Sequence, residues 1–587
     1  MRSVFSSCLA GLAMLAPPVL PGQSPAVTSG VLPAAAESPA VYPDRLFVKL
    51  AEGSGAELVR GSLRSRTGVD LTAVAAIFAR ARAEPLVTAL SWDELDRLHR
   101  HAVDVLPEGR APGHLGLWFR LRARSAADAQ QLLVSLREQA LVSYVYEEPR
   151  YALAGGVMLV GDIPPTTPDF TAMQHAHEPT PVGHGVRQVQ GIYGSRGRDV
   201  TLRMLETSWI FDHEDVSQLV ASHVIGPVPA VDLGYAHHGL SGSSIIFADR
   251  NEYGITGVAD EVSARFVSIE LNGGIENAMA MAIATTQPGD IMVSIVMVLV
   301  PALGPGTWLP FEFIQSGFDA TLTATANGRI VVVPAGNGNR SLDDPALLNR
   351  FDRSFRDSGA IMVASSDGGL LQRATYSNWG SRVDAHSWGE QVVAAGYGTL
   401  FWPGNDLRQA YTAGASGTSS STPHIVGVVA AMQGAAKKQL GRTLDNAEIL
   451  DLLHTYGPTT PDVIGRRPDL QAIFAALGIF DGLSVDEPDL ALGGTMHVTM
   501  DGAPGTVVAL FGSFDTADLD LGFNRHVHLG FATLQSLGAF VLTTTASKSV
   551  FVPNDPSLHG AQIYFQAARL QTTSVLELTN SCHVTIL

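Results

Sequence analysis

Residues 417–427 read Gly417-Thr418-Ser419-Ser420-Ser421-Thr422-Pro423-His424-Ile425-Val426-Gly427. This pattern predicts a tight turn that leads into a helix of small residues over 426–436, with Pro423 in its first turn, where proline is tolerated because the first helical amides lack internal partners. The turn would present the Ser419 hydroxyl at a helix N-terminus, where free amides stabilise negative charge. The alternative is a serine-rich cap on an ordinary helix. A serine nucleophile needs a base and an oxyanion donor, so we searched upstream for a histidine, a carboxylate and an amide.

Three upstream segments supply these groups. His238 stands in His237-His238-Gly239, and Glu206 follows an apolar run at 200–205 that predicts a strand. Asn337 follows a second predicted strand at 330–334 and lies in Ala335-Gly336-Asn337-Gly338. Catalytic groups gather at the carboxyl ends of parallel strands, so these side chains are expected at one edge of a sheet. Asp212 and Asp215 are alternative partners for the histidine.

At these residues the chain resembles the subtilisin-like serine proteases, which use the order acid, histidine, serine. The order here is Glu206, His238, Asn337 and Ser419. The resemblance covers about residues 187–475, and it includes the serine block at 417–423, the oxyanion block at 335–337, His213 and Asp215 after the acid, and a further block at 374–380. The chain has Glu206-Thr207-Ser208 where the family usually has Asp-Thr-Gly.

The resemblance implies a role for each candidate. Ser419 is the expected nucleophile, His238 the general base and then acid, and Glu206 the group that orients His238. The Ser419 amide and the Asn337 side chain are the expected oxyanion hole. The expected substrate-binding residues, along which a peptide adds as an extended strand, are Val293, Ser294, Ile295, Val296, Ala335 and Gly336.

No cofactor or metal site is predicted. The family often uses calcium, and Asp249, Asp260 and the pair at 343–344 are candidate ligands. Their spacing matches no known calcium loop, so we expect solvated loop acids there.

The composition is that of a globular protein. The chain has 587 residues, of which 46% are apolar and 16% charged, and a formal net charge of -18. These values suit three or four folded domains and argue against nucleic-acid binding. Cys8 lies in an apparent leader, so a mature chain would keep Cys582 alone and form no internal disulfide.

The first residues resemble a targeting segment. Arg2 precedes a short apolar run at 4–15 and a Pro/Ala-rich stretch, which predicts a signal peptide over 1–25, a disordered linker over 26–41 and a secreted protein. No transmembrane segment is expected, because the other long apolar run, at 291–301, is too short to span a bilayer and fits a buried parallel strand.

The remaining chain predicts three domains. Residues 42–155 predict a ferredoxin-like α+β unit with helices near 92–103 and 125–139, which would be the inhibitory propeptide if the resemblance holds. A linker over 156–186 leads to a doubly wound parallel-sheet α/β domain of subtilisin-like type over 187–480. Residues 481–587 predict a C-terminal β-sandwich of short strands.

The leading hypothesis is therefore a secreted serine endopeptidase made as a zymogen, with protein or peptide substrates and its own propeptide as partners. A second hypothesis is a catalytically impaired member of this fold that serves as a binding or scaffold protein. In a third, the C-terminal domain contacts a glycan or cell surface and the protease is its cargo.

Overall fold

The computed structural model describes residues 41–149, 166–479, 483–485, 489–501, 506–520, 526–543, 545–570 and 576–587. The predicted signal peptide and linker, up to residue 40, lie outside the described residues. So do residues 150–165, which include the end of the predicted propeptide. In the described ranges, no helix has both the length and the apolar composition needed to cross a membrane.

A six-stranded sheet forms the centre of the predicted α/β domain. Its strands are all parallel and lie in the order β14-β13-β12-β9-β7-β8. In chain order they are β7 (Thr201–Glu206), β8 (Ser263–Ser268), β9 (Ile291–Ser294), β12 (Ile330–Pro334), β13 (Ile361–Ser366) and β14 (Ala385–Trp388). The prediction of a parallel sheet in this region is confirmed.

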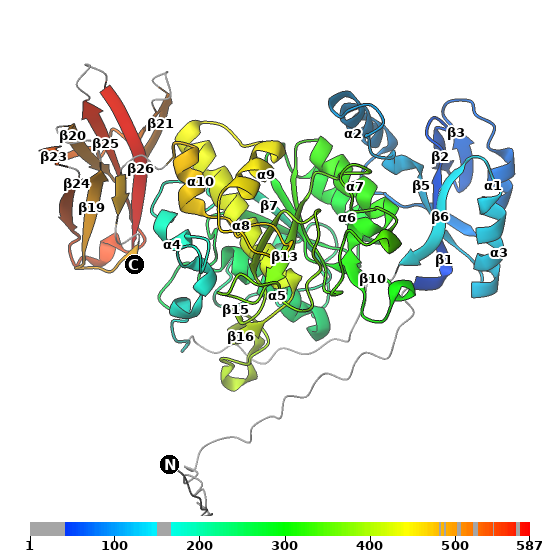
Figure 1. Ribbon diagram of the computed structural model, residues 1–587, viewed down its shortest axis with the longest axis horizontal. Helices are drawn as coiled ribbons and strands as arrows, with labels where there is room; N and C mark the ends of the chain where they lie inside the picture. The colour runs from blue at the N-terminus through cyan, green and yellow to red at the C-terminus, as the bar shows by residue number, and fades with distance from the viewer. Residues whose placement is uncertain are drawn as a thin grey trace, which may run out of the picture. The chain divides into compact units, whose positions relative to one another are not determined.

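Helices cover both faces of this sheet (Figure 1). They are α4 (Val186–Val189), α5 (Leu233–Phe247), α6 (Ile275–Ala284), α7 (Gln315–Ala326), α8 (Thr418–Ala435), α9 (Asn446–Thr455) and α10 (Leu470–Ala476). Val293 and Val332 point toward α5 and α8, whereas Met292 and Val331 point toward α6 and α7. Strand alternation therefore divides the interior into two apolar cores.

Two hairpins interrupt the α/β alternation. The apolar run at 291–301, predicted as one strand, is divided: β9 ends at Ser294, and β10 (Met297–Leu299) pairs instead with β11 (Trp308–Pro310). That prediction was wrong, because periodicity cannot locate a break inside a uniformly apolar run. The second hairpin joins β15 (Val392–Ala395) to β16 (Tyr411–Ala415).

The N-terminal domain is a four-stranded antiparallel sheet in the order β4-β5-β1-β6. Its strands are β1 (Val41–Leu50), β4 (Arg82–Pro85), β5 (Trp118–Arg122) and β6 (Val142–Pro149), with a side hairpin of β2 (Ala56–Val59) and β3 (Ser62–Ser65). Its helices are α1 (Thr72–Phe78), α2 (Trp92–Val105) and α3 (Ala126–Arg137). Ser125 caps α3 by accepting from the Asp128 amide at 3.1 Å.

This domain packs against helices α6 and α7. Phe47 and Trp118 share an apolar core with those helices, whereas Leu46 and Val48 pack toward α3. The Asn277 side-chain oxygen on α6 accepts from the amides of Thr88 and Ala89, both at 2.8 Å. The Trp118 indole N–H donates to Asp319 on α7 at 3.1 Å.

The described C-terminal residues form mainly antiparallel sheets around one apolar core. One sheet holds β17 (Leu483–Val485), β19 (Thr495–Asp501) and β24 (Thr545–Phe551). The other holds β18 (Asp489–Leu490), β26 (Leu576–Ile586), β25 (Gln562–Leu570), β20 (Val507–Ser513) and β23 (Gln535–Val541), and a small pair is formed by β21 (Thr516–Asp520) and β22 (His526–Leu529).

Candidate active site

The serine stretch begins its helix earlier than the sequence suggests. Helix α8 starts at Thr418, directly after Gly417, so Ser419 is its second residue and the predicted start at Val426 was wrong. Pro423 consequently lies in the second turn, not the first. Its missing N–H leaves the Ser419 carbonyl without a helical donor, while the Thr422 hydroxyl donates to the Thr418 carbonyl at 2.7 Å.

Ser419 keeps its own polar groups free. In the part of the chain that the structure describes, no hydrogen bond is assigned to its hydroxyl or its amide, although the next two amides bond back to the Gly417 carbonyl. The residue is 6% exposed. An unpaired amide at a helix N-terminus is a donor ready for an anion.

Buried Glu206 and half-buried His238 form an acid–imidazole pair. Glu206 is the last residue of β7 and is 1% exposed, and its Oε2 accepts from His238 Nδ1 at 2.7 Å. Its Oε1 accepts from the Thr207 amide, also at 2.7 Å. Burial alone would lower the pKa of His238, but the Glu206 charge and hydrogen bond outweigh it and raise that pKa. Because Nδ1 holds the proton in this pair, Nε2 is left as the acceptor.

The glycine after His238 lets helix α5 approach the end of β7. A Cβ on Gly239 would lie only 2.2 Å from the Ser208 carbonyl oxygen and 2.8 Å from the Trp209 ring. Ser208 in turn anchors the segment before the helix, since its hydroxyl donates to the Ala230 carbonyl at 2.8 Å. Asp232 then caps α5 by accepting from the Gly234 amide at 3.0 Å. These contacts determine how far His238 stands from the sheet edge.

Asn337 is oriented by the residue before the serine. Its Oδ1 accepts from the Thr418 amide at 3.0 Å and from the Thr418 hydroxyl at 2.9 Å, an amide orientation that follows from this network. A Cβ on Gly417 would lie 3.0 Å from the Ser419 hydroxyl and 3.2 Å from Asn337 Nδ2. The serine hydroxyl and the amide nitrogen therefore border the same small space, which only glycine leaves open.

Two residues of the 374–380 segment support this loop. Asn378 Nδ2 donates to the Ala335 carbonyl at 2.8 Å, and its Oδ1 accepts from the Gly338 amide at 3.0 Å. The Tyr376 hydroxyl accepts from the Gly417 amide at 3.0 Å and donates to the Gly389 carbonyl. The sequence of this segment predicted no role for either side chain.

One expected substrate contact needs correction. Val293 pairs with Val332 on one side and with Met204 on the other. Neighbouring strands therefore flank its backbone on both sides, and a substrate strand cannot pair with it. Ser294 pairs only with Leu205. The segment with a free backbone edge therefore starts at Ser294 and continues through Ile295 and Val296.

The other expected residues, Ala335 and Gly336, lie between β12 and Asn337. The Ala335 amide donates to the Val363 carbonyl at 2.7 Å, and the Gly336 carbonyl accepts from the Asn378 amide at 2.9 Å. These two residues can form a wall of a cleft, but these particular groups cannot bind substrate.

Helices α5 and α8 are packed together, yet the imidazole and the hydroxyl are not joined. A Cβ on Gly242 of α5 would lie 3.6 Å from the Pro423 ring of α8. Among the described residues, no hydrogen bond is assigned between His238 Nε2 and the Ser419 hydroxyl. Catalytic hydrogen bonds are often long in the absence of substrate.

The alternative carboxylates have other partners. Asp215 is buried and accepts from the Ile255 amide at 2.6 Å and from Asn251 at 2.8 Å. Asp212 is exposed and has a positive φ of 60°. Neither is hydrogen-bonded to His238, so Glu206 is the carboxylate that the structure places on the imidazole.

The considered calcium ligands do not fit a cation site. Asp249 accepts from the Ser217 amide and hydroxyl, both at 2.8 Å, and Asp343 accepts from Ser381. Asp260 was expected to be a solvated acid, but its side chain is only 4% exposed and pairs with Arg196 and Arg250. In the described ranges, no three His, Cys, Asp or Glu residues are grouped so as to hold a metal ion.

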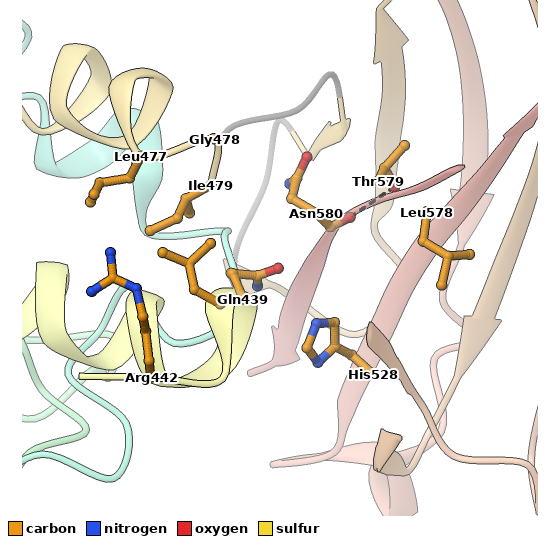
Figure 2. A pocket seen from close by; sticks show the side chains of 10 residues that line it. Gln439, Arg442, Leu477, Gly478, Ile479, His528, Leu578, Thr579 and Asn580 are labelled. Atoms are coloured by element: carbon orange, nitrogen blue, oxygen red, sulfur yellow. Dashed lines mark hydrogen bonds between the residues drawn. The ribbon is translucent and has the colours of Figure 1, made fainter. Parts of the chain in front are cut away.

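A cavity of about 380 Å³ lies elsewhere (Figure 2). Gln439, Arg442 and Ile479 line it from the α/β domain, and His528 and Asn580 line it from the C-terminal strands. None of the candidate catalytic residues is among its lining residues.

Comparisons with known proteins agree with this geometry. Residues 225–460 match the model of the Subtilase family. Subtilisin-like protease 3 of Trichophyton equinum is 33% identical over 133 residues, which cover 22% of this chain and 28% of the relative. Subtilisin-like protease 4 of Arthroderma gypseum is 31% identical over 124 residues, which cover 21% and 26%. The chain thus spans little more than a quarter of the length of these curated relatives.

Solved structures are also similar. A lanthipeptide protease is 16% identical with a TM-score of 0.38, and covers 52% of this chain and 94% of its own. The epidermin leader peptide processing protease EpiP of Staphylococcus aureus is 13% identical with a TM-score of 0.40, and covers 61% and 91%. The family match begins after Glu206 but contains His238, Asn337 and Ser419. Residues 225–460 of the chain are thus similar to the Subtilase family and to its subtilisin-like proteases.

Proposed function

We propose that the protein is a secreted serine endopeptidase that is made as a zymogen and cleaves peptide bonds through Ser419, His238 and Glu206. The observation that carries this proposal is the 2.7 Å bond between Glu206 and His238, at the sheet edge next to which Asn337 and Ser419 border one space. Glutamate in the acid position also serves other serine hydrolases.

The proposed reaction has two halves, acylation and deacylation of Ser419, and the same side chains act in both. Ser419 Oγ attacks the peptide carbonyl while His238 Nε2 takes its proton, and Glu206 stabilises the resulting imidazolium. The Ser419 amide and Asn337 Nδ2 hold the oxyanion. His238 then gives the proton to the leaving amine, and water releases the acyl group from Ser419 by the same steps in reverse. The substrate backbone would pair along Ser294, Ile295 and Val296.

We also infer that the N-terminal domain is a ferredoxin-like propeptide and that the C-terminal domain is a β-sandwich. The strand order β4-β5-β1-β6 and the docking on α6 and α7 support the first inference. The shared core of the two C-terminal sheets supports the second.

The proposed cut lies before the packed segment that opens the α/β domain. The Phe170 amide donates to the Gly254 carbonyl at 2.7 Å, and the Trp388 indole donates to the Val182 carbonyl at 2.7 Å. Residues 167–186 are therefore expected to stay with the mature protein. We place the cut between residues 150 and 166, where N-terminal sequencing of the processed protein would find the new terminus.

The experiment that tests the proposed function compares the unaltered protein with Ser419→Ala. The unaltered protein is expected to process itself, to digest casein and to be labelled at Ser419 by a fluorophosphonate, and the variant to do none of these. If both proteins are cut identically and neither is labelled after removal of the N-terminal domain, the scaffold hypothesis replaces this one.

A further inference from the structure

Tyr397 has a strained backbone next to the catalytic histidine. It follows β15 and has a φ of 61°, between Gly396 at 95° and Gly398 at 69°. A bulky residue in this region is rare, because its Cβ crowds the backbone. Such conformations persist only where the surroundings enforce them, and they are concentrated at functional sites.

His237, directly before His238, holds Tyr397 in place. The Tyr397 amide donates to His237 Nδ1 at 2.9 Å, and the two rings stack with their centroids 5.1 Å apart and an interplanar angle of 22°. Burial lowers the pKa of His237 to about 4, so its imidazole stays neutral and keeps accepting this bond at ordinary pH. The contact attaches the loop after β15 to the helix that carries the general base.

The Tyr397 ring is partly exposed to solvent, so packing against the protein does not account for all of its surface. Tyr397 is 42% exposed, and Trp402, on the same loop, is 44% exposed. A Cβ on Gly398 would lie 2.8 Å from the Trp402 ring, so the indole covers the residue after Tyr397. Two exposed aromatic rings therefore lie on one loop, which contacts His237, the residue before His238.

We propose that Tyr397 and Trp402 form a substrate subsite next to His238 that selects an aromatic or large aliphatic side chain of the peptide. The inference rests on the proposed peptidase function and names its substrate class. Exposed aromatic rings gain most from burying apolar surface, and a neighbouring pair offers a face and an edge to one side chain. If the loop had only a structural role, glycine would suit position 397 better, since it adopts a positive φ without strain.

That contrast gives the test, which uses the full chain and a matched control. Tyr397→Gly removes the ring and relieves the backbone. Leu348→Gly relieves the same type of strain at a φ of 57°, at a 65% exposed residue that makes none of the site's contacts described above. Peptides that differ only in one side chain near the cut, phenylalanine, leucine, glycine or arginine, are compared for kcat and KM, together with melting temperature.

We expect Tyr397→Gly to lose roughly 10-fold in kcat/KM for the phenylalanine and leucine peptides, mainly through KM. The glycine peptide should change little, and Tyr397→Phe should behave like the unaltered protein. Both glycine variants should melt no lower than the parent. An unchanged selectivity in Tyr397→Gly, the same change in Leu348→Gly, or a selective loss of the arginine peptide would overturn the proposal.

A binding measurement separates this inference from the proposed function. In the Ser419→Ala protein, binding of the same peptides is followed by intrinsic tryptophan fluorescence, with and without Tyr397→Gly, and a Trp402→Phe variant identifies the part of the signal that comes from Trp402. Tighter binding of the apolar peptides that depends on Tyr397 supports the subsite even if the unaltered protein fails to cut casein. Normal cleavage with equal binding of all four peptides overturns the subsite and leaves the peptidase proposal intact.

Discussion

At the scale of single residues, Glu206 divides its two oxygens between the backbone and the His238 imidazole. One oxygen accepts from the Thr207 amide and the other from His238, both at 2.7 Å. A carboxylate that is 1% exposed and bound on both sides has little freedom to move. The longer side chain of glutamate is thus accommodated by local hydrogen bonds.

The first prediction concerns the pH dependence that this pair imposes. His238 must be neutral to act as a base, and Glu206 raises its pKa. Glu206→Gln removes the negative charge, so the pKa falls and the acid limb of the kcat/KM profile moves to lower pH. The plateau rate should also fall, because the imidazolium loses its stabilising charge. Pre-steady-state and steady-state rates, measured from about pH 4 to about pH 9, report both effects.

Glu270→Gln is the control for a general loss of negative charge. Glu270 follows β8 and is exposed, and no hydrogen bond joins it to His238. It should leave the acid limb where it is. An acid limb that stays in place in Glu206→Gln, or that moves equally in the control, would show that Glu206 does not govern the titration of His238.

The second prediction concerns the oxyanion donor. Asn337→Leu removes the amide nitrogen that borders the Ser419 hydroxyl, so kcat should fall roughly 100- to 1,000-fold with a small change in KM. Thr418→Val removes the hydroxyl that orients Asn337 but keeps the hydrogen bond from the backbone amide of residue 418. Its loss of kcat should therefore be smaller. A rate unchanged in Asn337→Leu would mean that the oxyanion is held elsewhere.

Much of this residue-level picture could be predicted, and the reason is local. Ser419, His238, Glu206 and Asn337 each lie in a short segment whose neighbours report the same chemistry, as Gly239 and Gly417 do. Tyr376 and Asn378 act through hydrogen bonds to segments far along the chain, which spacing does not reveal. The Val293 error has the same origin, since its two pairing partners come from β7 and β12.

At the scale of elements, the sequence predicted where several strands of the parallel sheet end, but it did not predict where helix α8 begins. The apolar runs of β7, β12 and β13 are flanked by polar or glycine residues, which mark where each strand stops. Helix α8 was placed too late because Pro423 suggested a helix start, whereas Thr418–Thr422 already form a turn that tolerates the missing N–H. Because of such side-chain hydrogen bonds, proline can lie beyond the first turn of a helix, which its usual position does not predict.

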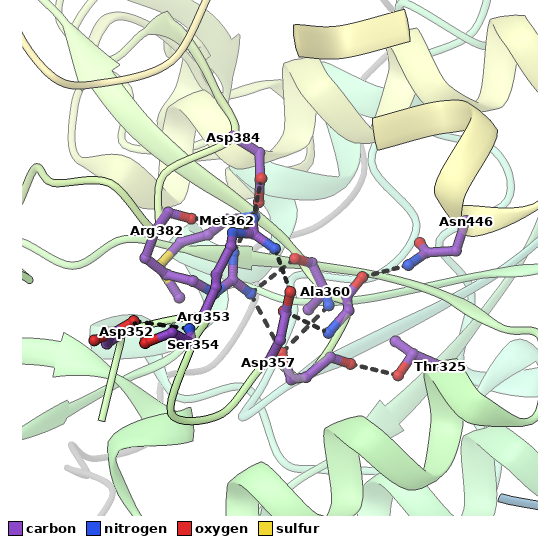
Figure 3. A network of polar contacts seen from close by, with 12 residues as sticks. Thr325, Asp352, Arg353, Ser354, Asp357, Ala360, Met362, Arg382, Asp384 and Asn446 are labelled. Carbon is purple, nitrogen blue, oxygen red and sulfur yellow. Dashed lines mark hydrogen bonds and ion pairs between the residues drawn. The ribbon is translucent and has the colours of Figure 1, made fainter. Parts of the chain in front are cut away.

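A buried charge network supports the other end of the sheet (Figure 3). Asp384, next to β14, is 1% exposed and accepts from Arg382 at 2.8 Å, from the Met362 amide at 2.8 Å and from Arg353. His454 of α9 lies 2.8 Å from the same carboxylate. The carboxylate thus joins β13, β14, α9 and the 350–360 loop. Burial alone would raise its pKa, but the charges of Arg382 and Arg353 and its hydrogen bonds outweigh burial and lower that pKa.

The third prediction follows from that network. Asp384→Ala leaves the Arg382 guanidinium, which is 2% exposed, without its main counter-charge. Breaking one partner of a buried ion pair costs about 3–5 kcal/mol in the free energy of unfolding, which urea denaturation would measure. Asp352→Asn, in the same loop but exposed, should leave the free energy of unfolding nearly unchanged. Equal stabilities of the two variants would contradict a structural role for Asp384.

At the scale of the whole molecule, the C-terminal domain is joined to the α/β domain by backbone as well as side chains. The Tyr193 amide donates to the Ser581 carbonyl and the His583 amide donates to the Gly191 carbonyl, both at 2.9 Å. Arg250, within the α/β domain, pairs with Asp489 and also bonds to Gln190 at 2.9 Å. Contacts between segments this far apart could not be predicted from a change in sequence texture near residue 481.

The last prediction is that this domain is needed for the fold of the α/β domain. A chain that ends at residue 479 loses the carbonyl that binds the Tyr193 amide and the charge that pairs with Arg250, and buried groups without partners are costly. It also exposes Ile192, which is 2% exposed in the full chain. We therefore expect the truncated protein to melt at a lower temperature and to be labelled at Ser419 more slowly. A detachable surface-binding module would instead leave both measurements unchanged. Arg250→Met in the full chain is the matched control, because it removes the Arg250 charge contacts but keeps the backbone hydrogen bonds. Its melting temperature and labelling rate should lie between those of the truncated and the unaltered protein.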